Sequence, residues 1–109
     1  MDQAIWGAVI VAAGSGERFG SGIPKQFLPM KGKTVLDWSL DVFMRMDAVT
    51  EVVVVTPARK ELWEPLWSPP ADIRTVAGGS RRQDSVMAGL RALQSVDHVL
   101  IHDAARPLL

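Results

Sequence analysis

"GAVIVAAG", residues 7–14, is apolar at odd and even positions alike and ends in a glycine. A short apolar run with β-branched residues is typical of a strand that is buried on both faces. Such strands belong to parallel sheets whose two faces are covered by helices. The chain continues as SGERFGSGIPKQF to Phe27, with Arg18 and Lys25 among its glycines. We therefore expect an α/β fold whose first loop lets the backbone approach a phosphate.

Strand-like and helix-like segments alternate along the rest of the chain. Thr34 is a candidate N-cap of one helix and Ser80 a candidate N-cap of another. The expected strands are 7–14, 51–56, 73–76 and one that begins at residue 98, and the expected helices are 34–46, 58–67 and 81–95. This alternation predicts a single α/β domain with a mostly parallel, right-handed wound sheet and flanking helices.

The expected helix at 58–67 contains a proline. Leu62, Leu66 and Trp67 would pack inward from it. Pro65 counts against it, because proline removes a backbone donor and disrupts a helix interior.

Composition excludes several classes of protein. The 109 residues suffice for one domain, and Lys plus Arg equals Asp plus Glu at 12 each. That balance argues against nucleic-acid binding, which favours a surplus of positive charge. The absence of cysteine excludes disulfides, thiolate nucleophiles and cysteine metal sites. The apolar run near the N-terminus is too short for a membrane span or a signal peptide, so we expect a soluble, cytoplasmic protein.

Three polar or glycine-rich segments follow the ends of expected strands. They are residues 14–25, 78–85 and 102–106. In open α/β sheets, ligands bind beyond the carboxyl ends of the strands, at the point where the strand order reverses. We expect the three segments to meet there.

Two familiar nucleotide-binding motifs do not match this chain. The dinucleotide fingerprint needs glycine at position 19, where Phe19 stands, and the P-loop motif needs glycine at Phe27. "GKT", residues 32–34, is better explained as a turn followed by a helix cap. No Ser-His-Asp arrangement is recognisable, and we favour a structural role for His102.

The chemistry of the first segment suits an anion. The small side chains of Ala12 and Ala13 leave room for a ribose or base, and amides around Gly14 and Gly16 can cradle phosphate oxygens. Arg18 and Lys25 add a planar fork and a mobile point charge, unless both are ordinary surface cations.

The other two segments add charges of both signs. Arg81 or Arg82 either neutralises a phosphate or pairs with Asp84. Asp103 directly follows a strand and suits Mg²⁺, or else accepts backbone N–H bonds in a turn or pairs with Arg106. Together the segments suit transfer at a nucleotide phosphate, which requires charge stabilisation and no enzyme nucleophile.

Three strings carry a family resemblance: AAGSGERFG with PKQF, GGSRRQDSV with AGL, and HDAARP. In this order they resemble the cytidylyltransferases that act on sugar-alcohol phosphates. The branch that serves non-mevalonate isoprenoid biosynthesis is the most similar. The resemblance implies a Rossmann-like nucleotidyltransferase fold, CTP and 2-C-methyl-D-erythritol 4-phosphate as substrates, Mg²⁺ as cofactor and a homodimeric parent protein.

The resemblance also implies roles for individual residues. Arg18 and Lys25 would stabilise the transition state, and Asp103 would bind Mg²⁺. The nucleotide would be held by residues of all three segments: Ala12, Ala13 and Gly14 at the ribose and base, Gly79 and Ser85 at cytosine, Ala104 near the ribose, and Arg82 and Arg106 as the arginines of their motifs.

Members of this family are considerably longer than 109 residues. We therefore expect residues 1–109 to be the CTP-binding part of an N-terminal fragment, without the acceptor-binding part and dimer arm, and inactive alone. Two alternatives remain open at this point. One is a ribitol-5-phosphate cytidylyltransferase, and the other is a nucleotide-binding module without catalysis.

Overall fold

The computed structural model describes residues 4–14 and 24–105. Within them four parallel strands form one sheet in the order β5-β4-β1-β6. The strands of this sheet are β1 (Trp6–Val11), β4 (Val49–Thr56), β5 (Arg74–Ala77) and β6 (His98–Asp103). The α/β class and the parallel sheet predicted from the sequence are therefore confirmed.

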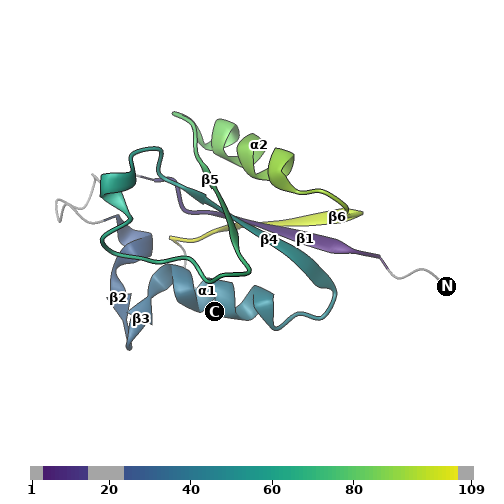
Figure 1. Ribbon diagram of the computed structural model, residues 1–109, viewed down its shortest axis with the longest axis horizontal. Coiled ribbons are helices and arrows are strands. Elements are labelled where there is room, and N and C mark those ends of the chain that lie inside the picture. Colours follow the sequence, from purple (N-terminus) through teal and green to yellow (C-terminus); the bar gives the residue numbers. More distant parts are fainter. Residues whose placement is uncertain (1–3, 15–23, 106–109) are drawn as a thin grey trace.

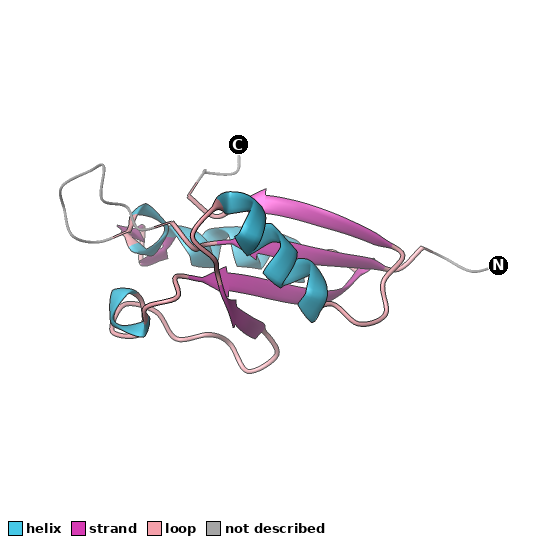
Figure 2. Ribbon diagram, turned by 90° about the horizontal axis from the view of Figure 1, so that it is seen from above, coloured by secondary structure: helices cyan, strands magenta, loops and turns pink. Residues whose placement is uncertain are grey.

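Two helices cover the two faces of this sheet (Figure 1). Helix α1 (Val35–Met44) lies on one face, over a core that contains Ala8, Ile10 and Val54. Helix α2 (Arg82–Ala92) lies on the other face, where Val9, Val11 and Val55 are buried. The view in Figure 2 shows α2 running across the strands with α1 behind them. The alternate residues of β1 thus face different helices, which explains why the whole strand is apolar.

Helix α1 begins with a reciprocal cap. The Thr34 hydroxyl accepts a hydrogen bond from the Asp37 N–H (3.1 Å), and the Asp37 carboxylate accepts one from the Thr34 N–H (3.2 Å). Before it, the short strands β2 (Pro29–Met30) and β3 (Lys33–Thr34) form an antiparallel hairpin. Its two turn residues, Lys31 and Gly32, have positive φ angles of 53° and 95°. The interpretation of "GKT" as a turn and a helix cap is confirmed.

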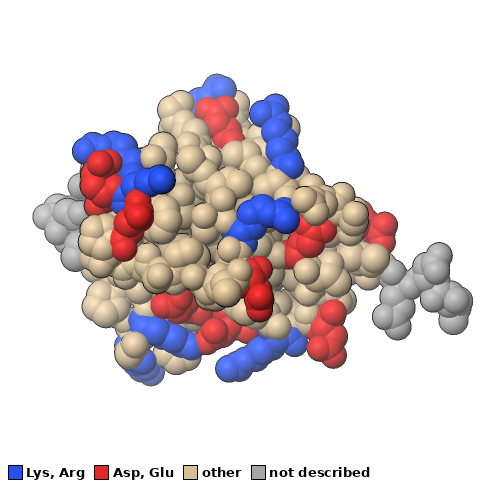
Figure 3. All heavy atoms as spheres, in the orientation of Figure 1, with Lys and Arg blue, Asp and Glu red and all other residues tan. Residues whose placement is uncertain are grey.

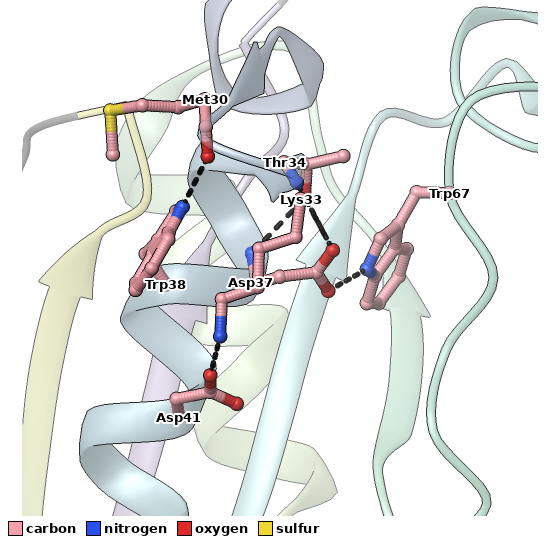
Figure 4. A network of polar contacts seen from close by, with 7 residues as sticks. All are labelled: Met30, Lys33, Thr34, Asp37, Trp38, Asp41 and Trp67. Atoms are coloured by element: carbon pink, nitrogen blue, oxygen red, sulfur yellow. Dashed lines mark hydrogen bonds and ion pairs between the residues drawn. The ribbon is translucent and has the colours of Figure 1, made fainter.

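A small polar network joins this hairpin to α1 (Figure 4). Asp37 also accepts a hydrogen bond from Trp67 Nε1 (2.8 Å), and Trp38 Nε1 donates to the Met30 carbonyl (2.6 Å). Lys33 pairs with Asp41 and lies 4.1 Å from the centre of the Trp38 ring. The network fixes the chain directly after the 3₁₀ helix η2 (Lys25–Phe27).

The helix predicted at 58–67 is wrong. Only a short 3₁₀ helix, η3 (Lys60–Leu62), forms there, followed by turns. Pro65 explains this, because it has no N–H to continue a helix. The inward residues are Trp63 and Trp67, at 9% and 5% exposure, whereas Leu66 is exposed.

Both ends of α2 also differ from the prediction. Ser80 is not the N-cap: Arg81 holds that position, and its N–H donates to the Asp84 carboxylate at 3.3 Å. The helix ends at Ala92 and not at 95, and Val86, Leu90 and Leu93 pack on the sheet.

The Glu51 carboxylate fixes the chain beyond α2 by accepting from the N–H groups of Ser95 (2.8 Å) and Gln94 (2.9 Å). These bonds lower the pKa of Glu51, with the Arg74 charge as a smaller cause. Their stabilising effect is thus present at neutral pH and is lost as the pH falls through this lowered pKa.

Basic and acidic side chains lie interspersed on the face shown in Figure 3. In the part of the chain that the structure describes, no helix has the length and apolar character needed to cross a membrane.

The two buried tryptophans near η3, Trp63 and Trp67, allow a matched test of stability. Among the described residues, Trp63 Nε1 has no hydrogen-bond partner, whereas Trp67 Nε1 donates to Asp37. Trp67→Phe should lower the free energy of unfolding by about 1–2 kcal/mol more than Trp63→Phe, because it alone breaks a hydrogen bond to a carboxylate. Chemical denaturation of both variants measures this difference. Equal losses would mean that the Asp37 contact does not stabilise the fold.

Candidate functional site

The three segments that follow strand ends meet around one cavity of about 490 Å³. The chain leaves β1 for β4 on one side, and later crosses from β5 over β1 to β6 on the other, so the strand order reverses at β1. The cavity lies at this switch point, as predicted. The described residues that line it are Val11, Ala13, Gly14 and Gln26, then Gly79, Ser80, Arg81, Arg82 and Ser85, and finally Asp103 and Ala105.

Most of the described candidate residues therefore lie on the cavity wall. Ala12 and Ala104 do not: both are fully buried, and their N–H groups bond to the carbonyls of Val55 (2.8 Å) and Val11 (2.9 Å). These two small residues instead let the loops after β1 and β6 stay in contact with neighbouring strands.

Lys25 is exposed on η2, next to Gln26, which does line the cavity. The remaining candidates, Gly16, Arg18 and Arg106, lie outside the described residues.

The first and second segments touch at a glycine. A Cβ on Gly78 would lie 2.5 Å from Ala13 Cβ and 2.7 Å from Ser85 Oγ, so no other residue fits without movement. Ser85 is buried, and its hydroxyl accepts a hydrogen bond from the Gly79 N–H at 3.2 Å. This contact sets the position of the second segment against the end of β1.

Charges of both signs face the cavity. Arg82, the first residue of α2, lies 3.8 Å (Nη1 to Oδ2) from Asp103, and Arg81 pairs with Asp84 at 3.2 Å. An arginine in the first helical turn opposes the helix dipole, so a nearby anion is needed to offset it. Asp103 supplies that negative charge here, and a bound phosphate would do the same.

Asp103 makes the predicted turn contact and pairs with an arginine other than the predicted one. Its Oδ1 accepts a hydrogen bond from the Ala105 N–H at 3.0 Å, which closes a turn, and its Oδ2 faces an arginine. That arginine is Arg82, on a different segment, and Arg106 lies outside the described residues. The pair thus joins the second and third segments.

The Asp103 carboxylate fits Mg²⁺ only together with further ligands. In the described ranges no three His, Cys, Asp or Glu side chains gather as a metal site. Of the described lining residues, Asp103 is the one acid. Mg²⁺ typically takes one or two protein carboxylates together with substrate phosphates and water, which suits a single carboxylate opposite an arginine-rich wall.

His102 has a structural setting, as favoured from the sequence. Its Nε2 lies 3.2 Å from Ser39 Oγ on α1, and its ring contacts the Phe43 ring at 5.6 Å between centroids. It therefore contacts α1 and does not line the cavity.

Sequence reasoning missed Gln26. Its amide donates hydrogen bonds to the Ala12 carbonyl (2.7 Å) and the Gly14 carbonyl (2.9 Å), and its exposure is only 3%. The one available signal was a polar residue directly before the core residue Phe27, which the sequence alone does not distinguish from a surface glutamine.

Two glycines of the site should respond differently to alanine. Gly78→Ala places a methyl group against Ala13 and Ser85 and should cost about 1–3 kcal/mol of stability. Among the described residues, a Cβ on Gly14 would meet nothing within 4 Å, so Gly14→Ala should leave the free energy of unfolding nearly unchanged. Denaturant titration of both variants distinguishes the two sites. A tolerated Gly78→Ala would contradict the close contact between the segments.

Comparisons with known proteins agree with this arrangement. The family model described as 2-C-methyl-D-erythritol 4-phosphate cytidylyltransferase matches residues 6–109. Proteins of that name from Rhodococcus jostii and Prochlorococcus marinus are 44% and 46% identical over 92–93% of this chain. The chain spans 44% and 46% of their lengths, and 26% of a bifunctional IspD/IspF enzyme from Ruegeria sp. that is 45% identical.

Solved structures give the same result. The crystal structure of 4-diphosphocytidyl-2C-methyl-D-erythritol synthase from Anaerococcus prevotii superposes with a TM-score of 0.73 at 31% identity, over 97% of this chain and 46% of that one. The Thermus thermophilus cytidylyltransferase gives a TM-score of 0.63 at 36% identity, over 92% and 41%. With its switch-point cavity and a family match over nearly all of its length, this chain belongs to the 2-C-methyl-D-erythritol 4-phosphate cytidylyltransferase family.

Proposed function

We propose that the protein to which this chain belongs transfers CMP from CTP to 2-C-methyl-D-erythritol 4-phosphate. One observation carries the proposal. Three segments far apart in the sequence enclose one cavity at the carboxyl ends of β1 and β6, with arginines on one wall and a carboxylate on another. Family membership supports the choice of nucleotide and acceptor.

The reaction needs no covalent enzyme intermediate. A phosphate oxygen of the acceptor forms a bond to the α-phosphorus of CTP, and the bond from that phosphorus to the bridging oxygen breaks. Diphosphate leaves with the electron pair, and a CDP-alcohol forms. The protein's task is to position the two substrates and to stabilise negative charge on the pentacoordinate phosphorus.

In this proposal each segment has its own task. Backbone groups at Ala13 and Gly14 hold the ribose and base, and Gly79 with Ser85 lies on the cytosine side. Lys25, together with Arg18 in the first motif, stabilises the charge that develops at the α-phosphate.

Asp103 would hold Mg²⁺ with the phosphates of CTP, and Arg82, now paired with Asp103, would turn to the triphosphate. The metal, when bound, offsets phosphate charge and favours the departure of diphosphate.

The chain supplies the nucleotide-binding part in this account, and the acceptor-binding part lies outside its 109 residues. A homodimeric, cytoplasmic parent protein is part of the same proposal. Size-exclusion chromatography with light scattering tests the dimer.

The direct test incubates the whole protein with CTP, Mg²⁺ and either acceptor. We expect release of diphosphate and formation of the CDP-alcohol with 2-C-methyl-D-erythritol 4-phosphate, and much slower turnover with ribitol 5-phosphate. Faster turnover with ribitol 5-phosphate would reassign the acceptor. A folded protein that binds CTP but transfers CMP to neither would be a nucleotide-binding module.

Lys25→Ala and Arg18→Ala should each lower kcat by at least ~10²-fold, the typical loss when one charge stabiliser is removed. Lys31→Ala is the matched control, because Lys31 is an exposed lysine in the β2–β3 turn and does not line the cavity. Steady-state kinetics measures all three. Unchanged turnover in either of the first two variants would remove that residue from the catalytic role.

Asp103→Asn should move the Mg²⁺ dependence to higher concentration, because an amide is a poorer ligand for a hard cation. Asp72→Asn, in an exposed loop, is its control. Titration of activity and of CTP affinity with Mg²⁺ compares the variants. A metal titration that Asp103→Asn leaves unaltered would contradict ligation by this carboxylate.

A further inference from the structure

We propose that Gln26 is a positioning residue for nucleotide binding. In this view its side-chain amide fixes the direction of the peptide groups at the end of β1, and so sets how that backbone meets a ribose hydroxyl or a phosphate oxygen. The inference rests on the proposed nucleotide site and adds a residue that the cavity's charges alone do not indicate.

The geometry uses the full donor capacity of the amide. Nε2 of Gln26 lies 2.7 Å from the Ala12 carbonyl oxygen and 2.9 Å from the Gly14 carbonyl oxygen. A glutamine NH₂ group has two hydrogens, so one donor group serves both carbonyls. At 3% exposure, water has little access to replace it. Loss of this amide would leave two carbonyl groups without their partner.

Gln26 is itself carried by a rigid element. It lies in η2, and its neighbour Phe27 is 2% exposed in the core, where its ring contacts that of Trp67 at 6.3 Å between centroids. The Phe27 N–H also donates to the Pro24 carbonyl at 3.0 Å. Gln26 therefore links the end of β1 to the core on the face of the sheet that α1 covers.

The orientation of the Ala12 carbonyl also sets the direction of the Ala13 N–H. In a planar trans peptide the C=O of one residue and the N–H of the next point in opposite directions. With the Ala12 carbonyl held toward Gln26, the Ala13 N–H points to the other side. Within residues 4–14 and 24–105 this N–H has no hydrogen-bond partner, and Ala13 lines the cavity. The Ala13 N–H is thus placed to donate a hydrogen bond to an oxygen atom of a ligand.

Lys25 lies on the same short helix as Gln26. It directly precedes Gln26 in η2, and its carbonyl accepts a hydrogen bond from the Leu28 N–H at 3.1 Å. The element that directs the backbone at Ala13 therefore also fixes the main chain from which Lys25 extends. The buried Gln26 amide would thus fix the Ala13 N–H, which binds the nucleotide, and the main chain of Lys25, which acts in catalysis, relative to each other.

The test is an NMR titration of the ¹⁵N-labelled chain with CTP and Mg²⁺. Without nucleotide, the Gln26 side-chain NH₂ should exchange with solvent far more slowly than that of Gln94, which is exposed after α2. On titration, the Ala13 and Gly14 amide signals should shift saturably. Gln26→Met keeps the length of the side chain but removes both donors, and Gln94→Met is the matched control.

We expect Gln26→Met to raise the Kd for CTP at least tenfold and to abolish the saturable shift of Ala13, while Gln94→Met binds as the unmodified chain does. Thermal melting is followed in parallel. A merely structural role would lower the melting temperature of Gln26→Met without changing its Kd well below that temperature, and this result would overturn the inference.

Two further outcomes are separable. If the Gln26 NH₂ of the unmodified chain exchanges as fast as that of Gln94, the positioning role is wrong even if Gln26→Met does not fold. If the unmodified chain shows no saturable shift with CTP, the proposed nucleotide site in this chain fails first, and the role of Gln26 fails with it.

Discussion

The structure depends on the burial of β1 on both faces and its pairing on both edges. Ala8, Val9 and Ile10 have no exposed surface, and the strand pairs in parallel with β4 and β6. A strand held in this way cannot shift without exposing apolar surface and breaking two ladders of hydrogen bonds. Its carboxyl end is therefore a firmly fixed point from which a loop extends. The cavity forms where that end meets the turn before α2 and the end of β6.

Electrostatic balance is the second constraint on the site. Arg82 sits where a helix disfavours positive charge, and Asp103 lies 3.8 Å away on another element. Both side chains are partly exposed, so their pairing contributes little to stability. In the proposed function, the arginine would meet the phosphates of a nucleoside triphosphate and the carboxylate would meet a divalent cation. The uncharged Gln26 amide would set the direction of the Ala13 N–H at the same cavity.

Much of this could be predicted from the sequence, because β1, β4 and α1 follow simple rules. Apolar runs become buried strands, and Thr34 with Asp37 makes a reciprocal cap. The switch-point rule correctly predicts that the three segments meet. The sequence-based predictions failed where tertiary contacts override local conformational preferences. Trp63 and Trp67 are buried without a regular helix between them, Asp84 makes Arg81 the N-cap in place of Ser80, and the role of Gln26 depends on carbonyls 12 and 14 residues away.

The central claim is that the three segments form one nucleotide site. A crystal structure of the chain with CTP and Mg²⁺ tests it most directly. The account predicts a nucleotide in the cavity between β1 and α2, with the Ala13 N–H donating to it, Gly79 beside the base and the metal bound by Asp103 and phosphate oxygens. A nucleotide bound elsewhere, or one that contacts only one of the three segments, would contradict it.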